Sequence, residues 1–598
     1  MQQLETDVAI IGAGGGGLRA AIAVAEKYPD LDVALISKVY PMRSHTVAAE
    51  GGAAGVIQSH DSFEDHFNDT VSGADWLADQ DVVEYFVQQC PQEMVRLEHW
   101  GCPWSRRPDG SINVRAFGGM KIERTWFAAD KTGFHILHTL FQTSIKYPSI
   151  SRLDEYFVTD LLVEDGRVYG VLAIDIANGT FTRILADSVI IATGGAGRVY
   201  RFNTNGGIVT GDGMALAYRA GAPLRDMEFV QYHPTGLPGS GILMTEGCRG
   251  EGGILTNAQG YRYLQDYGLG PETPVGKPEN KTMELGPRDR LSQAFWHEEQ
   301  KGRVIETSRG TAVNLDLRHL GEKIIDERLP FIRELARAYL GVDPVYQPVP
   351  VRPTAHYTMG GIQTDITTAT AIDGLFAVGE CASSGLHGAN RLGSNSLSEL
   401  CVMGKVAGES AGDFARRNRL GESPASVCEL ARERADAWSE MKRRRGSENM
   451  VAIRRELAEV MESGVGIYRQ DDLLQSSCDK IAQLRQRYEK VSVDDKSHVF
   501  NTNWLCAIEL GFLLDVAETM AHSALARKES RGSHQRLDGR ELGWDQRNDQ
   551  HYLKHSLAHK RGTGVPDITY QDVTITRSPP GERLYGGAGR AAQEDASE

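Results

Sequence analysis

A glycine-rich loop near the start of the chain constrains the fold more than any other feature. Residues 12–17 are GAGGGG, which fits the pattern G-x-G-x-x-G. The loop follows the apolar residues 8–11 and precedes the alanine-rich residues 18–26, so the pattern predicts a strand, a tight turn and a helix. Glycines there let backbone N–H groups approach a pyrophosphate at the helix N-terminus. With a second strand predicted at 33–36, this is a dinucleotide-binding βαβ unit; a glycine turn without a ligand is the alternative.

The end of the second predicted strand indicates which dinucleotide binds. NAD-binding folds carry an acidic residue about 20 residues after the glycine loop, where it binds the ribose. Here Ser37 and Lys38 occupy that place. The absence of the acid disfavours NAD and leaves FAD, with Ser37 and the Lys38 backbone expected near the ribose.

The spacing of strand-then-glycine patterns predicts the fold class. The chain has 598 residues, too many for one hydrophobic core. Two further apolar segments ending in glycine, 188–195 and 375–379, are separated by about 180 residues. We therefore predict an α/β, Rossmann-like FAD-binding domain split by an inserted α+β capping domain, followed by a helical domain and a small C-terminal region. The predicted boundaries are 1–231 and 353–417 for the FAD-binding domain, 232–352 for the capping domain, 418–540 for the helical domain and 541–598 for the C-terminal region.

The second half of the chain changes in composition. Residues 425–490 are rich in Glu, Arg, Lys, Ala and Leu at helical spacing, which predicts a helical bundle. We expect another helix at 507–530 and a short β segment at 568–575. The tail from Gly586 has low complexity and is predicted to be disordered.

Charge, hydropathy and cysteine usage exclude several classes of protein. The net charge of -15 argues against a general nucleic-acid binder. No run of 18 apolar residues and no signal-peptide pattern is present, so we expect a cytoplasmic chain without a membrane span. The eight cysteines are scattered, with no C-x-x-C, so no metal, iron–sulfur or c-type haem site is expected on this chain. Electrons must then pass between the flavin and another protein.

Two groups of motifs carry candidate chemistry. His45 lies in the small-residue loop RSHTVAAEGG (43–52), directly after the dinucleotide unit and so near the expected flavin ring, although a single histidine is more often structural. Five loops then place His or Arg beside Gly or Pro, and loops on rigid scaffolds often carry function. Two arginines and two histidines that converge would hold a dicarboxylate, because arginine presents a bidentate fork; each alone could be a surface ion pair. The loops are 233–236, 245–252, 286–289, 356–361 and 387–396.

With these residues the chain resembles the flavoprotein subunit of the fumarate reductase and succinate dehydrogenase family, over about residues 5–585, and most closely the membrane-bound bacterial quinol:fumarate reductases. The most specific stretches are RSHTVAAEGG at 43–52, CPWSRRPDG at 102–110, GGMKIERTWFAADKTGFH at 118–135, HPTG at 233–236, MTEGCRGEGG at 244–253, HYTMGGI at 356–362, HGANRLGSNSL at 387–397 and RKESRGSH at 527–534.

The resemblance implies that the His45 imidazole is bonded covalently to the 8α carbon of FAD, which raises the flavin potential. It also implies that the helix beginning near Ser396 directs its N-terminus at the flavin ring. The implied FAD contacts are Gly12, Ala13, Gly14, Gly15, Gly16, Ser37, Lys38, Ser44, Thr46, Glu50, Gly51, Gly52, Tyr156, Phe157, Val158, Asp212, Tyr357, Glu380, Arg391, Ser394, Asn395, Ser396 and Leu397.

The resemblance further implies a fumarate site. His356 and Arg391 would hold one carboxylate, and Thr245 and Glu246 the surroundings of the other, with hydride passing from the flavin to one alkene carbon. Arg288 would give the proton to the other carbon and regain it through Glu246 and Arg249. The implied catalytic residues are Arg288, His233, Arg249 and Glu246, and the implied substrate-binding residues are Phe117, Thr245, His356 and Arg391.

Direction and partners also come from the resemblance. Glu50, where succinate dehydrogenases tend to carry Gln, favours fumarate reduction in anaerobic respiration; succinate dehydrogenase is the alternative, and an inert binding or assembly module with this fold is a second. His45 disfavours L-aspartate oxidase, and the absence of C-x-x-C-H disfavours soluble haem-containing fumarate reductases. The implied partners are an iron–sulfur subunit and two membrane-anchor subunits with quinol, which would hold the chain at the cytoplasmic face of the inner membrane. The helical region from 418 and the block 527–534 are the candidate docking surfaces.

Overall fold

The computed structural model describes residues 1–279, 281–419, 421, 423–562 and 564–583. Its largest sheet has the strand order β6-β2-β1-β9-β8-β7, and β17 also pairs with β9. β1, β2, β6, β9 and β17 run parallel to one another, whereas β8 pairs antiparallel with both β9 and β7. The strands are β1 (Gln2–Ile11), β2 (Val33–Ser37), β6 (Ile150–Asp154), β7 (Tyr156–Glu164), β8 (Arg167–Asp175), β9 (Thr180–Ile191) and β17 (Leu375–Ala377).

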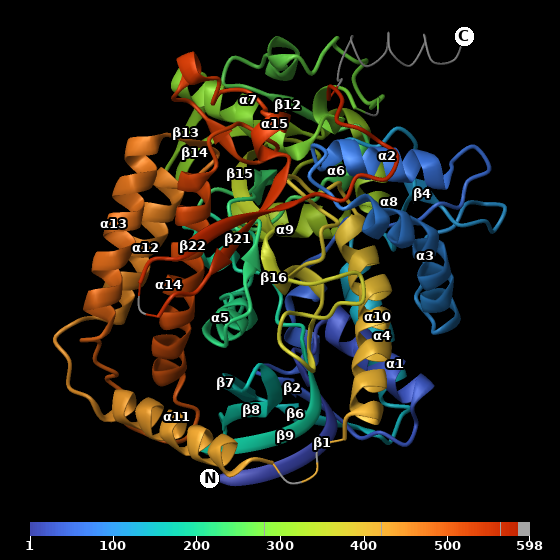
Figure 1. The fold of residues 1–598 in the computed structure, drawn as a ribbon. Helices are drawn as coiled ribbons and strands as arrows, with labels where there is room; N and C mark the ends of the chain where they lie inside the picture. The colour runs from blue at the N-terminus through green and yellow to red at the C-terminus, as the bar shows by residue number, and fades with distance from the viewer. Residues whose placement is uncertain (280, 420, 422, 563, 584–598) are drawn as a thin grey trace.

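The sheet confirms the expected split dinucleotide fold. β17 lies beside β9 in space, in register Phe376 with Ile190, although the capping region separates them along the chain. β1 is longer than its apolar part because residues 2–6 also pair with β9. One face of the sheet is covered by α1 and α10, which pack against each other (Figure 1). The helices of this region are α1 (Gly15–Lys27), α2 (Phe63–Gly73), α3 (Gln80–His99), α4 (Thr132–Ser144), α5 (Asp212–Arg219) and α10 (Asn395–Arg417).

The capping region forms its own sheet and its own hydrophobic core. Its strand order is β11-β15-β14-β12, with β13 paired to β14. The apolar side chains between Leu237 and Val351 form one cluster of their own, and Figure 1 shows these elements at the end of the molecule opposite the large sheet. The elements are β11 (Val230–Gly236), α6 (Gly247–Gly250), β12 (Ile254–Thr256), α7 (Arg288–Gln300), β13 (Ile305–Thr307), β14 (Gly310–Asp316), α8 (Gly321–Arg328), α9 (Pro330–Leu340) and β15 (Val349–Thr358).

Helices dominate the region after residue 424, as predicted. α12, α13 and α14 lie side by side along one flank of the molecule (Figure 1). The four helices are α11 (Ala425–Arg443), α12 (Met450–Gly464), α13 (Asp471–Tyr488) and α14 (Thr502–Ala526). None of the described helices is long and apolar enough to cross a membrane.

The block 527–534 corrects two predictions. α14 ends at Ala526, so residues 527–530 are not helical. Arg527, Glu529, Arg531 and His534 have no exposed surface, so their side chains are not a docking surface. The reason is a buried ion network: Arg527 Nε bonds Glu228 Oε1 at 2.6 Å, and the Arg531 guanidinium bonds Glu529.

The C-terminal region returns to the FAD-binding domain. β21 (Lys554–His559) pairs with β22 (Asp567–Asp572) and with β10 (Leu224–Arg225), and β10 pairs in turn with β16 (Gly361–Gln363). The sequence indicated the β22 segment and missed β21. The predicted disorder from Gly586 onward falls outside the described residues.

Candidate active site

At two positions of the glycine loop, Gly12 and Gly17, the backbone leaves no room for a side chain. Gly12 has φ +111°, and a Cβ there would lie 2.2 Å from the carbonyl oxygen of Ala192. A Cβ on Gly17 would lie 1.8 Å from Gly12 O. The loop therefore holds β1, β9 and α1 in close contact. α1 starts at Gly15 and has no acidic residue in its first turn, so its positive end suits a phosphate.

A large cavity opens beside this loop. Its volume is about 690 Å³, within the range of small-molecule and cofactor sites. The Ser44 hydroxyl is buried there with no hydrogen-bond partner among the described residues, as expected where a ligand supplies one. The predicted FAD-site residues that line the cavity are Gly12, Ala13, Gly14, Gly15, Gly16, Ser37, Lys38, Ser44, His45, Thr46, Glu50, Tyr156, Phe157, Val158, Asp212, Tyr357, Glu380, Ser396 and Leu397. Their chemistry and the cavity volume fit FAD.

The remaining predicted FAD contacts lie behind the cavity wall. A Cβ on Gly52 would lie 2.4 Å from Trp126 O, and one on Gly51 would lie 2.5 Å from the Phe117 ring, so both are packing positions. The Ser394 hydroxyl bonds Thr125 at 2.8 Å, and the Asn395 amide bonds His66 at 3.0 Å. They do not line the cavity and instead fix the start of α10, whose third residue, Leu397, does.

His45 projects from the loop between β2 and β3 (Ala53–Ala54) into the cavity. Its Nε2 lies 3.0 Å from Asn205 Nδ2, and the Gly206 N–H donates to its Nδ1 at 3.4 Å. Burial lowers the pKa of His45 to about 4, so the imidazole is neutral at physiological pH. A neutral ring has the lone pair that bond formation to carbon requires. Asn205 was not predicted from the sequence.

The part of the cavity lined by Lys38 and Asp212, where the sequence predicts the ribose, carries an internal ion network. Lys38 Nζ lies 2.6 Å from Asp212 and 2.8 Å from Glu509 on α14. The Lys38 side chain is thus engaged by carboxylates. Elsewhere in the cavity lining, burial raises the pKa of Glu380 to about 7.

The five predicted His and Arg loops converge at one end of this cavity. His233 on β11 and His356 on β15 have ring centroids 5.0 Å apart. The pairing of these strands shifts register between Gln231 and Tyr232, which makes His356 an extra residue in a β-bulge. A bulge redirects a side chain, and His356 lines the cavity with Nδ1 2.8 Å from Thr204 Oγ1.

Arg288 is the first residue of α7, directly after Pro287. Its Nη2 and Nε lie 2.6 and 2.7 Å from Glu246 Oε2. The other oxygen, Oε1, accepts from Gly118 N–H at 2.8 Å and lies 3.5 Å from Arg249 Nη1. The sequence-based grouping of Arg288, Glu246 and Arg249 is therefore one connected buried cluster.

Gln231 links the two arginines predicted for the substrate site, and sequence reasoning missed it. Its Oε1 accepts from Arg288 Nη1 and from Arg391 Nη2, each at 3.1 Å. Its Nε2 donates to Asn390 Oδ1 at 2.9 Å and to Arg391 O at 2.7 Å. Its position two residues before His233 on the same strand was the available signal, because residues i and i+2 share a face.

Arg391 also contacts the flavin cavity wall. Its guanidinium carbon lies 4.3 Å from the centre of the Tyr357 ring, and its Nη1 donates to Ser396 Oγ at 2.9 Å. Arg391 does not line the large cavity itself; with Arg288 it lines a second, water-sized one of about 10 Å³. Phe117 and Thr245 are buried beside these groups, around the Gly51 backbone.

The electrostatics of this cluster favour an anionic ligand. Burial, and then Arg288, lower the pKa of both His233 and His356 well below the ordinary value, so both rings are neutral. Burial alone would raise the pKa of Glu246, but Arg288 and Arg249 outweigh it and lower the pKa. Burial lowers the pKa of Arg391 to about 10, which keeps it charged. Three guanidinium groups therefore face one carboxylate.

The FAD-binding domain model matches residues 7–397, and the model for the C-terminal part of fumarate reductase flavoproteins matches residues 454–585. The fold and cavity thus define a flavoprotein oxidoreductase that binds FAD. The chain belongs to the family of fumarate reductase flavoprotein subunits: it is 65% identical over 601 residues to the fumarate reductase flavoprotein subunit of Proteus vulgaris, covering 100% of this chain and 99% of the relative.

Other relatives agree. The fumarate reductase flavoprotein subunit of Escherichia coli is 64% identical, covering 99% of this chain and 98% of the relative. A solved Escherichia coli quinol fumarate reductase superposes with a TM-score of 0.96 over 98% of this chain and 99% of that one, at 64% identity. A succinate dehydrogenase flavoprotein subunit of Rickettsia bellii is more distant, at 40% identity over 97% of this chain and 98% of the relative.

Proposed function

We propose that this chain is the catalytic flavoprotein subunit of a membrane-bound quinol:fumarate reductase and reduces fumarate to succinate in anaerobic respiration. The observation that carries the proposal is the convergence of Arg288 and Arg391 on Gln231, next to two neutral histidines at the end of the flavin cavity. Two guanidinium forks with neutral donors match a small dicarboxylate. FAD, when bound, supplies the hydride for the alkene.

The residues of this chain bind and orient the substrate. Arg391 and His356 hold one carboxylate, and Thr245 lies near the other, beside Glu246. Because Arg391 is fixed by Gln231 and Ser396, its fork has one orientation. A carboxylate turned out of the alkene plane by these contacts polarises the double bond, which prepares it for reduction.

Arg288 donates the proton. Arginine is a weak acid in water, but its Nη2 and Nε contact Glu246 Oε2, and Glu246 Oε1 lies near Arg249. Glu246, ionised because its pKa is lowered, can accept a proton from the Arg249 side and pass it on to Arg288. His233 is neutral and buried, and we assign it substrate binding and a secondary catalytic role.

His45 carries the covalent link to the 8α carbon of FAD. The neutral imidazole, its place in the cavity wall and its contacts with Asn205 and Gly206 support this assignment. In this arrangement the flavin stays with the chain through many turnovers.

The partners follow from the electron path. The eight cysteines are free and scattered, so electrons reach the flavin from another protein. A solved relative, 64% identical, is a quinol-fumarate reductase with menaquinol molecules. We infer that this chain assembles with an iron–sulfur subunit and two membrane-anchor subunits and sits peripherally at the cytoplasmic face of the inner membrane.

The alternative is succinate dehydrogenase, which would use the same site in the reverse direction. Two observations favour the reductase: the higher identity to fumarate reductase subunits and Glu50, whose carboxyl lines the cavity. An inert module with this fold is disfavoured, because the buried charges of the site are costly to keep without a ligand.

The test is the ratio of fumarate reduction to succinate oxidation by the assembled complex. Fumarate reduction is followed through oxidation of a reduced viologen, and succinate oxidation through reduction of a dye. A ratio above one supports the reductase. A ratio well below one would assign the chain to succinate oxidation, and no turnover in either direction would favour the inert module.

A further inference from the structure

A C-terminal strap, residues 574–583, runs across the N-terminal segment 73–80. Gln80 Oε1 accepts from the backbone N–H groups of three consecutive strap residues, 576–578, at 2.9 to 3.1 Å. Gln80 Nε2 donates to Ser578 O at 2.6 Å, and Arg547 donates to Gly581 O at 2.7 Å. Backbone contacts of this number fix the path of the strap.

The strap ends in Arg583, whose side chain is only 4% exposed. Its Nη1 lies 2.8 Å from Asp289 Oδ2, and its Nη2 donates to Asp289 Oδ1 at 3.3 Å, so the contact is bidentate. The same guanidinium donates to Gly73 O at 3.3 Å and lies 3.7 Å from Asp75 Oδ2. Arg583 therefore connects the capping region, through Asp289, to the N-terminal segment, through Gly73 and Asp75.

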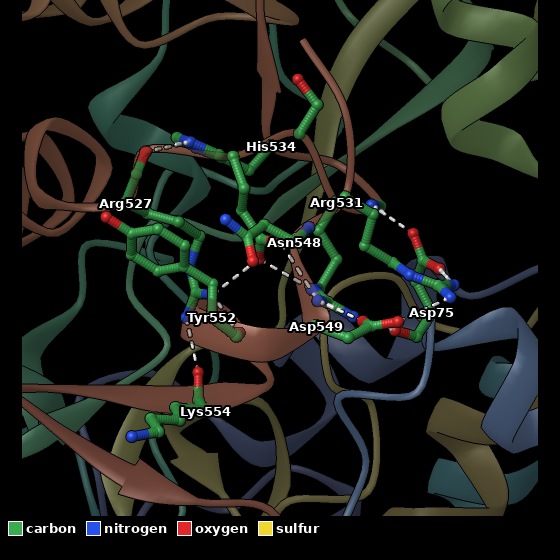
Figure 2. Close-up of polar contacts among 12 residues, drawn as sticks. Asp75, Arg527, Arg531, His534, Asn548, Asp549, Tyr552 and Lys554 are labelled. Atoms are coloured by element: carbon green, nitrogen blue, oxygen red, sulfur yellow. Dashed lines mark hydrogen bonds and ion pairs between the residues drawn. The ribbon is translucent and has the colours of Figure 1, made fainter. Parts of the chain in front are cut away.

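Asp75 contacts several arginines of the C-terminal region. Arg547 Nη1 lies 2.9 Å from its carboxylate. Arg531, which lies beside Asp75 in Figure 2, donates to its backbone oxygen at 2.8 Å. Burial would raise the pKa of Asp75, but Arg583, Arg531 and Arg547 lower it. Its φ of +54° is in the left-handed region, so the turn at residue 75 is fixed by its surroundings.

The C-terminal region also contacts the loop that carries Arg391. The N–H and the hydroxyl of Ser533 both donate to Ala389 O at 3.0 Å, two residues before Arg391. A Cβ on Gly532 would lie 2.5 Å from that oxygen. The C-terminal region thus contacts the loop that carries one substrate arginine, at Ala389 through Ser533, and the helix of the other through Arg583.

Asp289 follows Arg288 in the first turn of α7. Adjacent helical side chains point about 100° apart. Arg583 therefore contacts the start of α7 on a different side from the one on which Arg288 faces Glu246 and Gln231. We propose that Arg583 is a positioning residue that acts through Asp289 to hold Arg288 beside Glu246 and Gln231. The expected effect on catalysis rests on the proposed function, whereas the contact by which Arg583 holds the start of α7 does not.

The test uses the full chain with FAD and four variants: R583A, R583K, D289N and the double variant R583A/D289N. Displacement of a proton donor costs turnover more than binding, because Arg391 remains in place. We expect R583A to lower kcat for fumarate about 10- to 100-fold with a smaller change in KM, R583K to recover part of it, and the double variant to be no slower than R583A.

A second readout does not depend on the substrate. Hydrogen exchange of the backbone amides of 288–300 should be faster in R583A than in the parent. The matched control is R577A, on the same strap, whose side chain pairs with Glu64, 57% exposed, and lies over the Phe67 ring of α2. R577A should leave both kcat and this exchange unchanged.

The outcomes distinguish the positioning role of Arg583 from the proposed function of the chain. Parent-like kcat and exchange in R583A would overturn it. If R583A does not fold, D289N decides: a loss of kcat supports the proposal, and parent-like kcat overturns it. If the parent chain itself does not reduce fumarate while exchange at 288–300 still rises in R583A, the proposed function fails and the positioning role of Arg583 holds.

Discussion

Arg288 and Arg391 donate to the same atom, Oε1 of Gln231, each at 3.1 Å, although one lies in the capping region and the other directly before α10. One neutral amide oxygen thus sets the separation of two buried cations. A carboxylate in that place would neutralise them, and an apolar group would leave them to repel.

Gln231→Leu should weaken fumarate binding and slow turnover. We expect kcat/KM to fall at least about 10-fold, because hydrogen bonds to charged groups contribute about 1.5–3 kcal/mol each. Gln231→Glu should raise KM more than it lowers kcat, because its carboxylate competes with the substrate. Steady-state viologen assays measure both. The control is Ser292→Ala, which removes a hydrogen bond to Tyr232 O behind the site; parent-like KM in Gln231→Leu would contradict the prediction.

Gly12→Ala should abolish FAD binding. The added Cβ would lie 2.2 Å from Ala192 O at φ +111°, so β1 and β9 would have to separate where they hold the cofactor. The measurement is the ratio of flavin to protein after purification. Gly207→Ala is the control, because its Cβ would meet no atom within 4 Å. A parent-like flavin ratio in Gly12→Ala would show that the cradle tolerates a side chain.

His45→Ser should keep FAD bound but release it on denaturation. The glycine loop and cavity remain, whereas the neutral imidazole that we assign to the covalent bond is lost. The denatured, precipitated protein should show flavin fluorescence for the parent and none for the variant. Succinate oxidation should be lost, because the flavin potential falls. Fluorescence that persists in His45→Ser would place the covalent bond on another residue.

His555→Gln should destabilise the protein in a pH-dependent way. His555 Nδ1 lies 2.6 Å from Asp226 and its Nε2 3.3 Å from Asp79, which itself bonds Arg225. Burial would lower the pKa of His555, but the two carboxylates raise it to about 9. The charged His555 therefore stabilises the folded protein fully below the ordinary histidine pKa of about 6.5, and this stabilisation is lost as the pH rises through about 9.

At about 1.4 kcal/mol per pKa unit, the expected difference in unfolding free energy near pH 6 is on the order of 3 kcal/mol. Thermal unfolding of parent and variant across this pH range measures it. A gap between parent and variant that stays constant from about pH 6 to above 9 would show that His555 is not charged in the folded protein.

The sequence predicted the parts of the site that depend on local patterns. The glycine loop specifies a turn that no other residue allows, so Gly12 and the start of α1 were predictable. Recognition of family motifs then brought in Arg288, Glu246 and Arg391, and the structure places them in one cluster.

The parts that were missed depend on tertiary contacts. Gln231 looks like any polar residue of a strand until Arg288 and Arg391 approach it from segments about 60 and 160 residues away. Residues 527–534 looked like an exposed charged surface because charge usually means solvent. Most of these residues are buried instead, because their charges are paired with partners such as Glu228, almost 300 residues earlier in the chain.

The bulge between β11 and β15 has a consequence for how the chain selects its substrate. Gln231, His233 and His356 stand on the two strands that join the capping region to the FAD-binding domain, whereas Arg288 arrives on α7 and Arg391 on the loop before α10. Under the proposed function, substrate binding and proton donation therefore both require these segments to lie together. A ligand that contacts both arginines then also lies beside the proposed proton donor, Arg288.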